Sequence, residues 1–122
     1  MKTIIMKDPV MESEGSLFPK VDITAYEAEE SAIKSHARLP TSEEYDRLFN
    51  KRPWPFLIHE WTSTSTGSER VLRGGSWYSC ARHVCAAYRG AGDPSFASAG
   101  VGFRLARDIA DDDPVPDGWI EI

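Results

Sequence analysis

Residues 70–107, RVLRGGSWYSCARHVCAAYRGAGDPSFASAGVGFRLAR, contain the pattern that decides the fold. An apolar stretch at Val71 and Leu72 runs into Gly74-Gly75-Ser76-Trp77, and a second glycine-marked stretch, residues 101–106, follows later. Both stretches have the composition of β-strands. The segment between them is longer than most connections in a compact domain, and loops of that length are usually functional or disordered. We therefore expect the two stretches to be framework and the intervening residues to serve the function.

The length of 122 residues predicts a single domain, residues 1–122, with one modest hydrophobic core. Hydrophobic residues make up 41% of the chain, with four Trp, four Tyr and five Phe, so the composition is that of a globular protein. The net charge of -5 argues against binding to nucleic acid, which requires a basic surface.

No apolar run is long enough to cross a membrane. The first apolar run, at residues 4–6, is also too short for the hydrophobic part of a signal peptide. These features predict a protein of the cytoplasm, or a virion component made there, that binds no membrane. Two cysteines in such a chain imply no disulfide framework.

The first half of the chain predicts a strand and two helices. Residues 1–7 have strand composition, and residues 11–23 are rich in turn formers. Thr24 with Glu27 fits a capping box that begins a helix. We expect this helix to reach His36 or Ala37, where the following Leu39-Pro40 breaks it. Its predicted buried face consists of Ala25, Ala28, Ala32 and Ile33.

A second capping box, Thr41 with Glu44, begins a second helix. Tyr45, Leu48 and Phe49 form its apolar stripe, and Pro53 ends it.

The second half of the chain predicts strands. They are expected at residues 57–62, 70–77 and 101–106, with a polar turn at residues 62–68. The acidic tail ends on Trp119-Ile120-Glu121-Ile122, which we expect to pair with the N-terminal strand as an edge strand. The order of elements predicts an α+β domain.

Several motifs together resemble a known family. They are residues 38–41 (RLPT) with Glu43 and Glu44, residues 60–62 (EWT), residues 71–77 (VLRGGSW), Arg89 and residues 102–104 (GFR). The chain is similar to the formylglycine-generating-enzyme/sulfatase-modifying-factor domain, a variant of the C-type lectin fold. The resemblance is strongest over residues 38–107. It implies a minimal C-type-lectin-like α+β domain, in which two helices pack on a small irregular antiparallel sheet with long loops.

The resemblance implies three functional classes. Formylglycine-generating enzymes are copper-dependent thiol oxidases, and a second class consists of iron sulfoxide synthases. The third class contains non-catalytic binding modules, including the variable proteins of diversity-generating retroelements, which bind changing ligands through the loop between GGSW and GFR.

Cys80 and Cys85 are the candidate catalytic residues of the copper-dependent alternative. The enzymes have two cysteines separated by four residues, as here, and two thiolates can hold Cu(I). The segment from Ser76 to Arg89 is shorter than in the enzymes, however, so the two cysteines superpose only if a flanking motif is broken. Two unrelated thiols or a regulatory disulfide are the other interpretations, and Arg82 and His83 could lower a thiol pKa.

The sequence predicts no metal site. His36, His59 and His83 lack the spacing of metal ligands, which argues against the iron class. The acidic run at residues 111–113 has the oxygen ligands that calcium takes, but we interpret it as a solvated turn. Calcium occurs in the family, yet its positions do not map onto this chain.

Other motif residues are expected to be structural. Buried Arg73 and Arg104 require an anionic partner, and Glu60 is the candidate. Gly74, Gly75 and Gly102 are expected to allow bends or close backbone approach. Trp61, Trp77 and Phe103 are expected in the core.

Residues 78–100 lack Lys, Glu, Gln, Met, Trp and Asn. This composition is expected if adenine-directed mutagenesis has diversified asparagine codons, and it also fits a loop selected for small residues. Aromatic and small side chains suit a binding surface. The predicted ligand-binding residues are Tyr78, Ser79, His83, Tyr88, Asp93 and Phe96.

The sequence thus favours a non-catalytic module that binds a protein or a glycan, of the kind found as a phage or retroelement-linked variable protein. A copper-dependent oxidase and a small phage accessory or regulatory protein are the alternatives. No cofactor is predicted for the binding module, and the exposed aromatic loop leaves homo-oligomerisation open.

Overall fold

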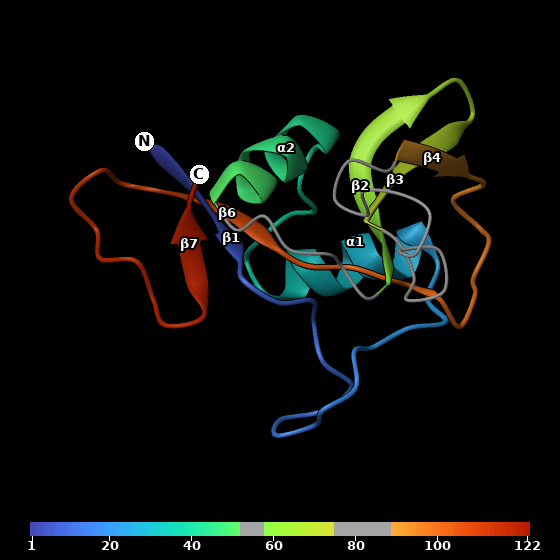
Figure 1. The fold of residues 1–122 in the computed structure, drawn as a ribbon, viewed down its shortest axis with the longest axis horizontal. Helices are drawn as coiled ribbons and strands as arrows, with labels where there is room; N and C mark the ends of the chain where they lie inside the picture. The colour runs from blue at the N-terminus through green and yellow to red at the C-terminus, as the bar shows by residue number, and fades with distance from the viewer. Residues whose placement is uncertain (52–57, 75–88) are drawn as a thin grey trace.

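The structure of the chain is a computed structural model, and it describes residues 1–51, 58–74 and 89–122 (Figure 1). The described residues form an α+β domain with two helices and two small sheets, which confirms the predicted fold class. The helices are α1 (Ala25–Lys34) and α2 (Ser42–Lys51). The strands are β1 (Lys2–Met6), β2 (His59–Thr66), β3 (Glu69–Gly74), β4 (Arg89–Gly92), β5 (Val101–Gly102), β6 (Ala106–Ile109) and β7 (Trp119–Glu121).

The first sheet joins the two ends of the chain. Its order is β6-β1-β7, and both pairings are antiparallel. Ile5 of the central strand lies opposite Ala106 on one side and Ile120 on the other. The N- and C-termini therefore lie close together (Figure 1), and the predicted pairing of the C-terminal strand with the N-terminal strand is confirmed.

The second sheet has the order β4-β3-β2-β5. Strands β2 and β3 are antiparallel, with a register shift between Trp61 and Ser65 that bends the hairpin. Strand β5 is parallel to β2, a departure from the purely antiparallel sheet that we expected. Strand β4 was not predicted, because Arg89–Gly92 has little β-propensity and owes its strand conformation to pairing with β3.

Two boundaries predicted for the strands are wrong. The polar turn expected at residues 62–68 is shorter, because β2 continues to Thr66 and the chain turns at Gly67, whose φ is 60°. The single strand expected at residues 101–106 is divided between the sheets. Val101 pairs with His59 in the second sheet, whereas Ala106 pairs with Ile5 in the first. The intervening residues 103–105 thus connect the two sheets.

Both predicted capping boxes are present. The Thr24 hydroxyl accepts from the Glu27 N–H at 3.1 Å while the Glu27 carboxylate accepts from the Thr24 N–H at 3.0 Å. Thr41 and Glu44 exchange the same pair of hydrogen bonds at the start of α2. These bonds satisfy backbone N–H groups that the first helical turn leaves without partners.

Helix α1 ends earlier than predicted. Ser35 is its C-cap, and His36 has a φ of 53°. The His36 N–H donates to the Ile33 carbonyl and the Ala37 N–H to the Ala32 carbonyl, which is the Schellman arrangement. The end of the helix is therefore set by these local bonds, and not by the later proline. Ile33, which we placed on the buried face, is 72% exposed.

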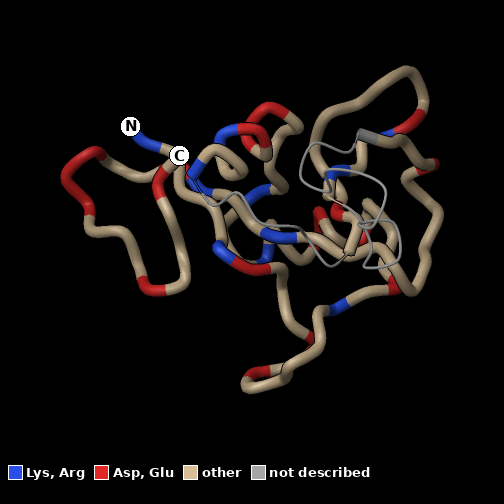
Figure 2. Tube along the Cα trace, in the orientation of Figure 1, with Lys and Arg blue, Asp and Glu red and all other residues tan. Residues whose placement is uncertain are grey.

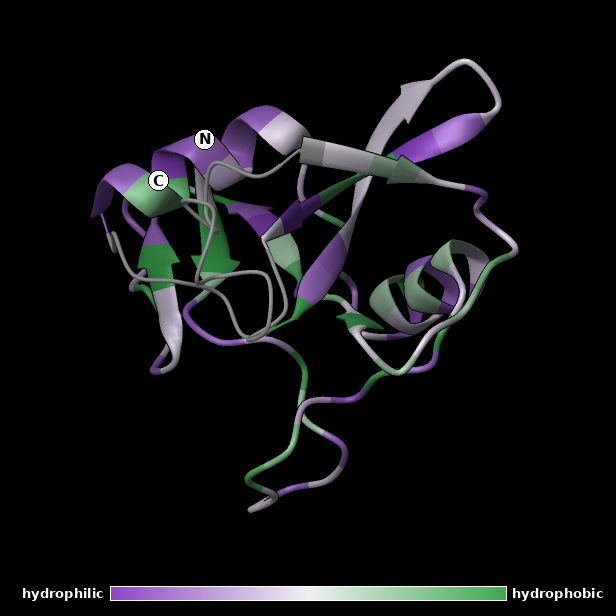
Figure 3. Ribbon diagram, turned by 45° about the vertical axis from the view of Figure 1, so that its right-hand side comes forward, coloured by the Kyte–Doolittle hydropathy of each residue, from purple (hydrophilic) through white to green (hydrophobic). Residues whose placement is uncertain are grey.

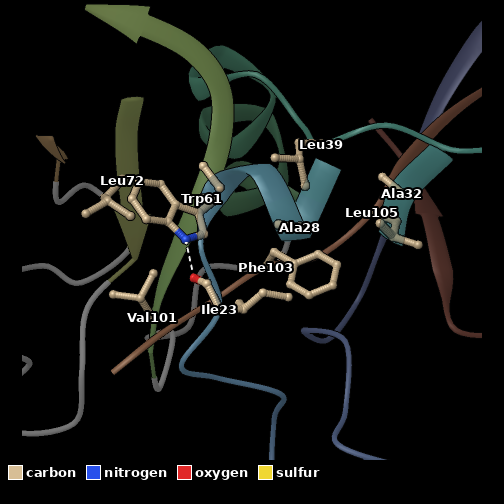
Figure 4. Packing of buried hydrophobic residues seen from close by; sticks show 10 residues of the cluster. Ile23, Ala28, Ala32, Leu39, Trp61, Leu72, Val101, Phe103 and Leu105 are labelled. Atoms are coloured by element: carbon tan, nitrogen blue, oxygen red, sulfur yellow. Dashed lines mark hydrogen bonds between the residues drawn. The ribbon is translucent and has the colours of Figure 1, made fainter. Parts of the chain in front are cut away.

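The main core lies between α1 and the second sheet (Figure 4). Trp61 and Phe103 are fully buried there, as predicted, and the Trp61 indole N–H donates to the Ile23 carbonyl at 2.9 Å. Alanines on the inner face of α1 let the helix approach these aromatic rings closely. A second cluster under α2 contains Ile5, Tyr45, Leu48 and Ala106, with Phe49 packed against it. Among the described residues, neither helix is long and apolar enough to span a membrane.

Gly102 occupies a position where a side chain would not fit. A Cβ built there would lie 2.5 Å from the Lys20 carbonyl oxygen and 2.7 Å from Cδ1 of Ile58. The first of these contacts is with backbone, which cannot move aside easily. Gly102 was expected to allow close backbone approach, and the backbone that approaches it is that of Lys20.

We predict that Gly102→Ala destabilises the protein by about 2 kcal/mol, the range typical of overpacking. The free energy of unfolding, measured by chemical denaturation, checks this value. Gly67→Asn is the control, because the Gly67 site is open and Asn tolerates positive φ. Equal losses in the two variants would show that steric contact at Gly102 is not the cause.

Candidate functional site

A buried ion pair joins β2 to the segment that follows β5. Arg104 donates from Nε to Oε1 of Glu60 at 2.6 Å and from Nη2 to Oε2 at 2.8 Å. The Tyr45 hydroxyl donates to the same Oε1 at 2.8 Å. The side chains of Glu60 and Arg104 are 0% and 2% exposed. Burial and the adjacent Glu60 carboxylate raise the pKa of Tyr45 well above its ordinary value, so its hydroxyl remains a donor.

Arg104 also connects this pair to the N-terminal strand. Its Nη1 donates to the carbonyls of Met6 at 3.0 Å and Lys7 at 2.9 Å. Burial by itself would lower the pKa of Arg104, but the charge and hydrogen bonds of Glu60 outweigh it and raise the pKa. The guanidinium thus stays charged while it holds β1 against the second sheet.

Arg73 uses different partners. Its Nη1 donates to the Ser42 carbonyl at 2.6 Å and to the Ser42 hydroxyl at 3.1 Å, and its Nη2 donates to the Asp46 carboxylate at 2.8 Å. Sequence reasoning offered Glu60 for both arginines and missed Tyr45, Ser42 and Asp46 as partners. The sequence contained a pattern that could have identified these partners. Residues 42, 45 and 46 lie on one face of the helix whose start the capping box predicted.

A further ion cluster holds the start of α2 to the first sheet. Arg38 donates to Glu44 at 2.7 and 2.8 Å and to Asp108 at 3.1 and 3.2 Å. The Thr3 hydroxyl also donates to Asp108, at 2.7 Å. Burial alone would raise the pKa of Glu44, but hydrogen bonds from Arg38 and from the Thr41 N–H outweigh it and lower the pKa.

The part of the predicted binding loop that follows β4, residues 93–100, is hydrogen-bonded to α1 and to the segment just before it. The Pro94 carbonyl accepts from the Ala25 N–H at 2.9 Å, and the Ser98 carbonyl accepts from the Asp22 N–H at 2.9 Å. These two bonds fix the loop beside the first turn of α1. Phe96, a predicted ligand-binding residue, lies between them and is 47% exposed.

Asp93 shapes the turn that presents Phe96. Its Oδ1 accepts from the Ser95 N–H at 2.8 Å and from the Ser95 hydroxyl at 2.6 Å, and these two hydrogen bonds lower its pKa. The Phe96 N–H donates to the Asp93 carbonyl at 2.9 Å. The structure thus gives Asp93 a part in the loop conformation, and its contact with a ligand stays a prediction.

A polar groove of about 430 Å³ opens beside β4, close to this loop in sequence. It lies between the start of α2 and the second sheet, where the Ser42 N–H donates to the Thr64 hydroxyl at 2.9 Å. Its lining is mostly hydroxyl-bearing and comprises Thr41, Ser42, Glu43, Thr64, Thr66, Val71 and Gly90. No sequence motif pointed to this groove, because its residues come from three separate segments.

The remaining predicted site residues fall in residues 75–88, outside the described residues. They are the candidate ligand contacts Tyr78, Ser79, His83 and Tyr88, the cysteines Cys80 and Cys85, and the expected framework residues Gly75 and Trp77. Gly74, the last residue of β3, has a φ of 78°, a left-handed conformation that glycine adopts at little cost.

The described residues contain no group of three or more His, Cys, Asp or Glu side chains that could hold a metal ion. The carboxylate of Asp111 lies 3.2 Å from the N-terminal ammonium group, and Asp112 and Asp113 are exposed. His59 contacts the Gly74 carbonyl through Nδ1 at 3.2 Å. These positions agree with the interpretation of the acidic run as a solvated turn.

The fold and its buried network can be compared with known families. Residues 54–109 match the family model of the sulfatase-modifying factor enzyme 1-like domain. The match covers both Glu60 and Arg104, and it supports the family resemblance of the motif-bearing half of the chain. It spans 56 of the 122 residues, from Trp54 to Ile109. A search among curated proteins gave no match.

The described residues of the site fall into a buried group and an exposed group. Glu60, Arg73 and Arg104 are buried and bound by protein groups, so they are placed to support the fold. Phe96, by contrast, is 47% exposed, and Thr66 of the groove lining is exposed as well. The described part of the site thus combines buried ion pairs with a partly exposed loop that carries Phe96.

We predict that Glu60→Gln destabilises the protein by about 3–5 kcal/mol, because it leaves the buried Arg104 charge without its counter-ion. Glu69→Gln, an exposed change on β3, is the control and should cost less than about 0.5 kcal/mol. Thermal and chemical unfolding measure both.

The double variant Glu60→Met with Arg104→Met removes both charges. We expect it to lose less stability than the sum of the two single variants, and a double-mutant cycle measures the difference. Strict additivity would argue against direct coupling between Glu60 and Arg104.

Acid should weaken the Arg38 cluster. Because the pKa of Glu44 is lower in the folded state, its contribution to stability is complete above the unfolded value of about 4.3 and is lost as the pH falls through the folded pKa. We therefore expect Glu44→Gln to cost about 1–2 kcal/mol at neutral pH and progressively less below about pH 4. Denaturation across this pH range tests it, with exposed Glu43→Gln as control. A cost independent of pH would contradict this role.

Proposed function

We propose that the chain is a non-catalytic ligand-binding module that presents the surface of residues 78–100 to a protein or a glycan. The observation on which the proposal rests is the exposed position of the 93–100 loop together with its backbone bonds to residues 22 and 25. A loop held in this way loses little conformational entropy when a ligand binds. Phe96 then offers apolar contact area at low entropic cost.

The separation between scaffold and surface supports the proposal. The ion pairs of Arg104 and Arg73 are formed with residues of β2 and α2, outside the 78–100 segment. Substitutions in the loop therefore leave both members of these two ion pairs in place. Such an arrangement is what a variable binding protein requires.

The composition of the loop supports a finer proposal, that the chain is a phage or retroelement-linked variable protein. The absence of Lys, Glu, Gln, Met, Trp and Asn from residues 78–100 fits diversified asparagine codons. The surrounding DNA should then contain a near-copy of the codons for residues 70–107, with adenines at the varied positions, beside a reverse-transcriptase gene. If this copy is missing, the diversification proposal fails while the binding proposal remains.

The binding proposal predicts how loop variants behave. Phe96→Ser changes a partly exposed side chain and should keep the unfolding free energy within about 0.5 kcal/mol of the wild type. Tyr88→Ser changes a second predicted contact residue. The same variants should lose at least tenfold in affinity for whichever oligosaccharide or bacterial surface protein the wild-type chain binds on printed arrays of both classes. Ser68→Ala, in the turn after β2, is the matched control and should retain binding.

Two outcomes would contradict the proposal. One is the failure of the wild-type chain to bind on either array. The other is copper-dependent thiol oxidation that is lost in Cys80→Ser and Cys85→Ser, which would support the oxidase alternative.

A further inference from the structure

The loop of residues 11–19 projects from the body of the protein, away from both sheets (Figure 1). Its two arms are joined by an antiparallel bridge between Met11 and Pro19. The Glu12 N–H donates to the Phe18 carbonyl at 2.9 Å. The loop therefore has its own hydrogen-bonded structure, which we call the projecting loop.

The base of the projecting loop is fixed to the core. The Val10 N–H donates to the Phe103 carbonyl at 2.9 Å, and the Lys20 N–H donates to the Val10 carbonyl at 2.8 Å. The Lys20 carbonyl also packs against Gly102, where a side chain would collide with it. These contacts hold both ends of the loop against Gly102 and Phe103, in the segment that begins with β5.

The tip is also ordered by local bonds. Gly15 has a φ of 78° at the turn, and the Ser16 N–H donates to the Ser13 carbonyl at 3.0 Å. The Ser16 hydroxyl oxygen accepts from the Phe18 N–H at 3.0 Å. A partner would thus meet a preformed tip, and pre-organisation reduces the entropic cost of binding.

Two large apolar side chains are displayed on this tip. Leu17 is 88% exposed and the adjacent Phe18 is 69% exposed. The ribbon of the projecting loop carries a hydrophobic stretch away from the sheets (Figure 3). The exposure of Leu17 and Phe18 does not stabilise the folded chain. Burying each of these side chains would contribute about 1.5–3 kcal/mol to stability. Apolar side chains of this kind act as anchors when a partner provides a pocket for them.

The charge of the projecting loop is entirely acidic. Glu12 and Glu14 are exposed, and residues 11–19 contain no Lys or Arg (Figure 2). Two further observations argue against a second copy of the chain as the occupant. The chain has a net charge of -5, and an apolar contact between two tips would bury on the order of 600 Å², well under the roughly 1,200 Å² of a stable interface.

We propose that the projecting loop is a docking element for a partner protein, which receives Leu17 and Phe18 in an apolar groove bordered by Lys or Arg side chains. The apolar pair provides the affinity, and Glu12 with Glu14 favours a basic rim and excludes acidic partners. This interaction is independent of the ligand-binding surface proposed above, because it uses none of residues 78–100.

A defined peptide can test this chemistry. The probe is a fluorescein-labelled amphipathic helix of leucine and lysine, whose apolar stripe is bordered by basic groups, and its counterpart replaces each lysine with glutamate. Fluorescence anisotropy measures affinity for the full chain. We expect the lysine peptide to bind at least tenfold more tightly than the glutamate peptide. Leu17→Ser with Phe18→Ser should weaken binding of the lysine peptide at least tenfold.

Matched variants separate the loop from the general charge and hydrophobicity of the chain. Glu12→Gln with Glu14→Gln should weaken binding two- to fivefold and reduce its salt dependence. Asp112→Asn with Asp113→Asn makes the same charge change in the exposed tail, and Ile33→Ser removes an exposed apolar residue on α1. Both controls should change the affinity less than twofold, and every variant should keep the wild-type melting temperature.

Three results would overturn the proposal. The first is unchanged peptide affinity in the Leu17→Ser/Phe18→Ser variant. The second is an equal loss of affinity in the tail variant, which would show that net charge alone drives binding. The third is a dimer in sedimentation experiments that dissociates when Leu17 and Phe18 are replaced, which would make a second copy the occupant.

Discussion

Glu60 and Arg104 form an ion pair inside the protein, where neither side chain reaches water. Isolated charges at such positions would cost several kcal/mol, so each requires the other. The pair joins β2 to the segment between the sheets, and Arg104 extends the connection to the carbonyls of Met6 and Lys7. The position of β1, and through it the whole first sheet, therefore depends on this contact. Tyr45 completes the network from α2.

This buried network explains how a small domain can display several loops. Among the described residues, the buried Glu60–Arg104 pair lies where β2, α2 and the end of β1 meet. The 93–100 loop and the projecting loop of residues 11–19 leave this framework at different points, and each is held by its own backbone hydrogen bonds. Ligand contacts at one loop thus need not disturb the other. The two proposals therefore place their contacts at separate loops.

Local patterns predicted a large part of this architecture. The capping boxes at Thr24 and Thr41 located both helix starts, because their hydrogen bonds involve residues only three positions apart. Phe96 was predicted as a contact residue from its place in a long loop of small side chains, and the structure shows that it is 47% exposed. The hydroxyl-lined groove beside Gly90 and the Arg73–Asp46 pair were not, because their members are distant in sequence and no local spacing relates them.

The sequence by itself determined the α+β class, the helix starts and the pairing of the chain ends, since capping, periodicity and apolar strand composition act over short distances. Only the tertiary structure decided how one predicted strand, residues 101–106, divides between two sheets. Its first residues pair with β2 and its last with β1, and between them Arg104 is bound by the buried Glu60. A charge becomes buried only when residues that are distant in sequence meet in the assembled core. Local sequence patterns therefore could not show how these strands pair.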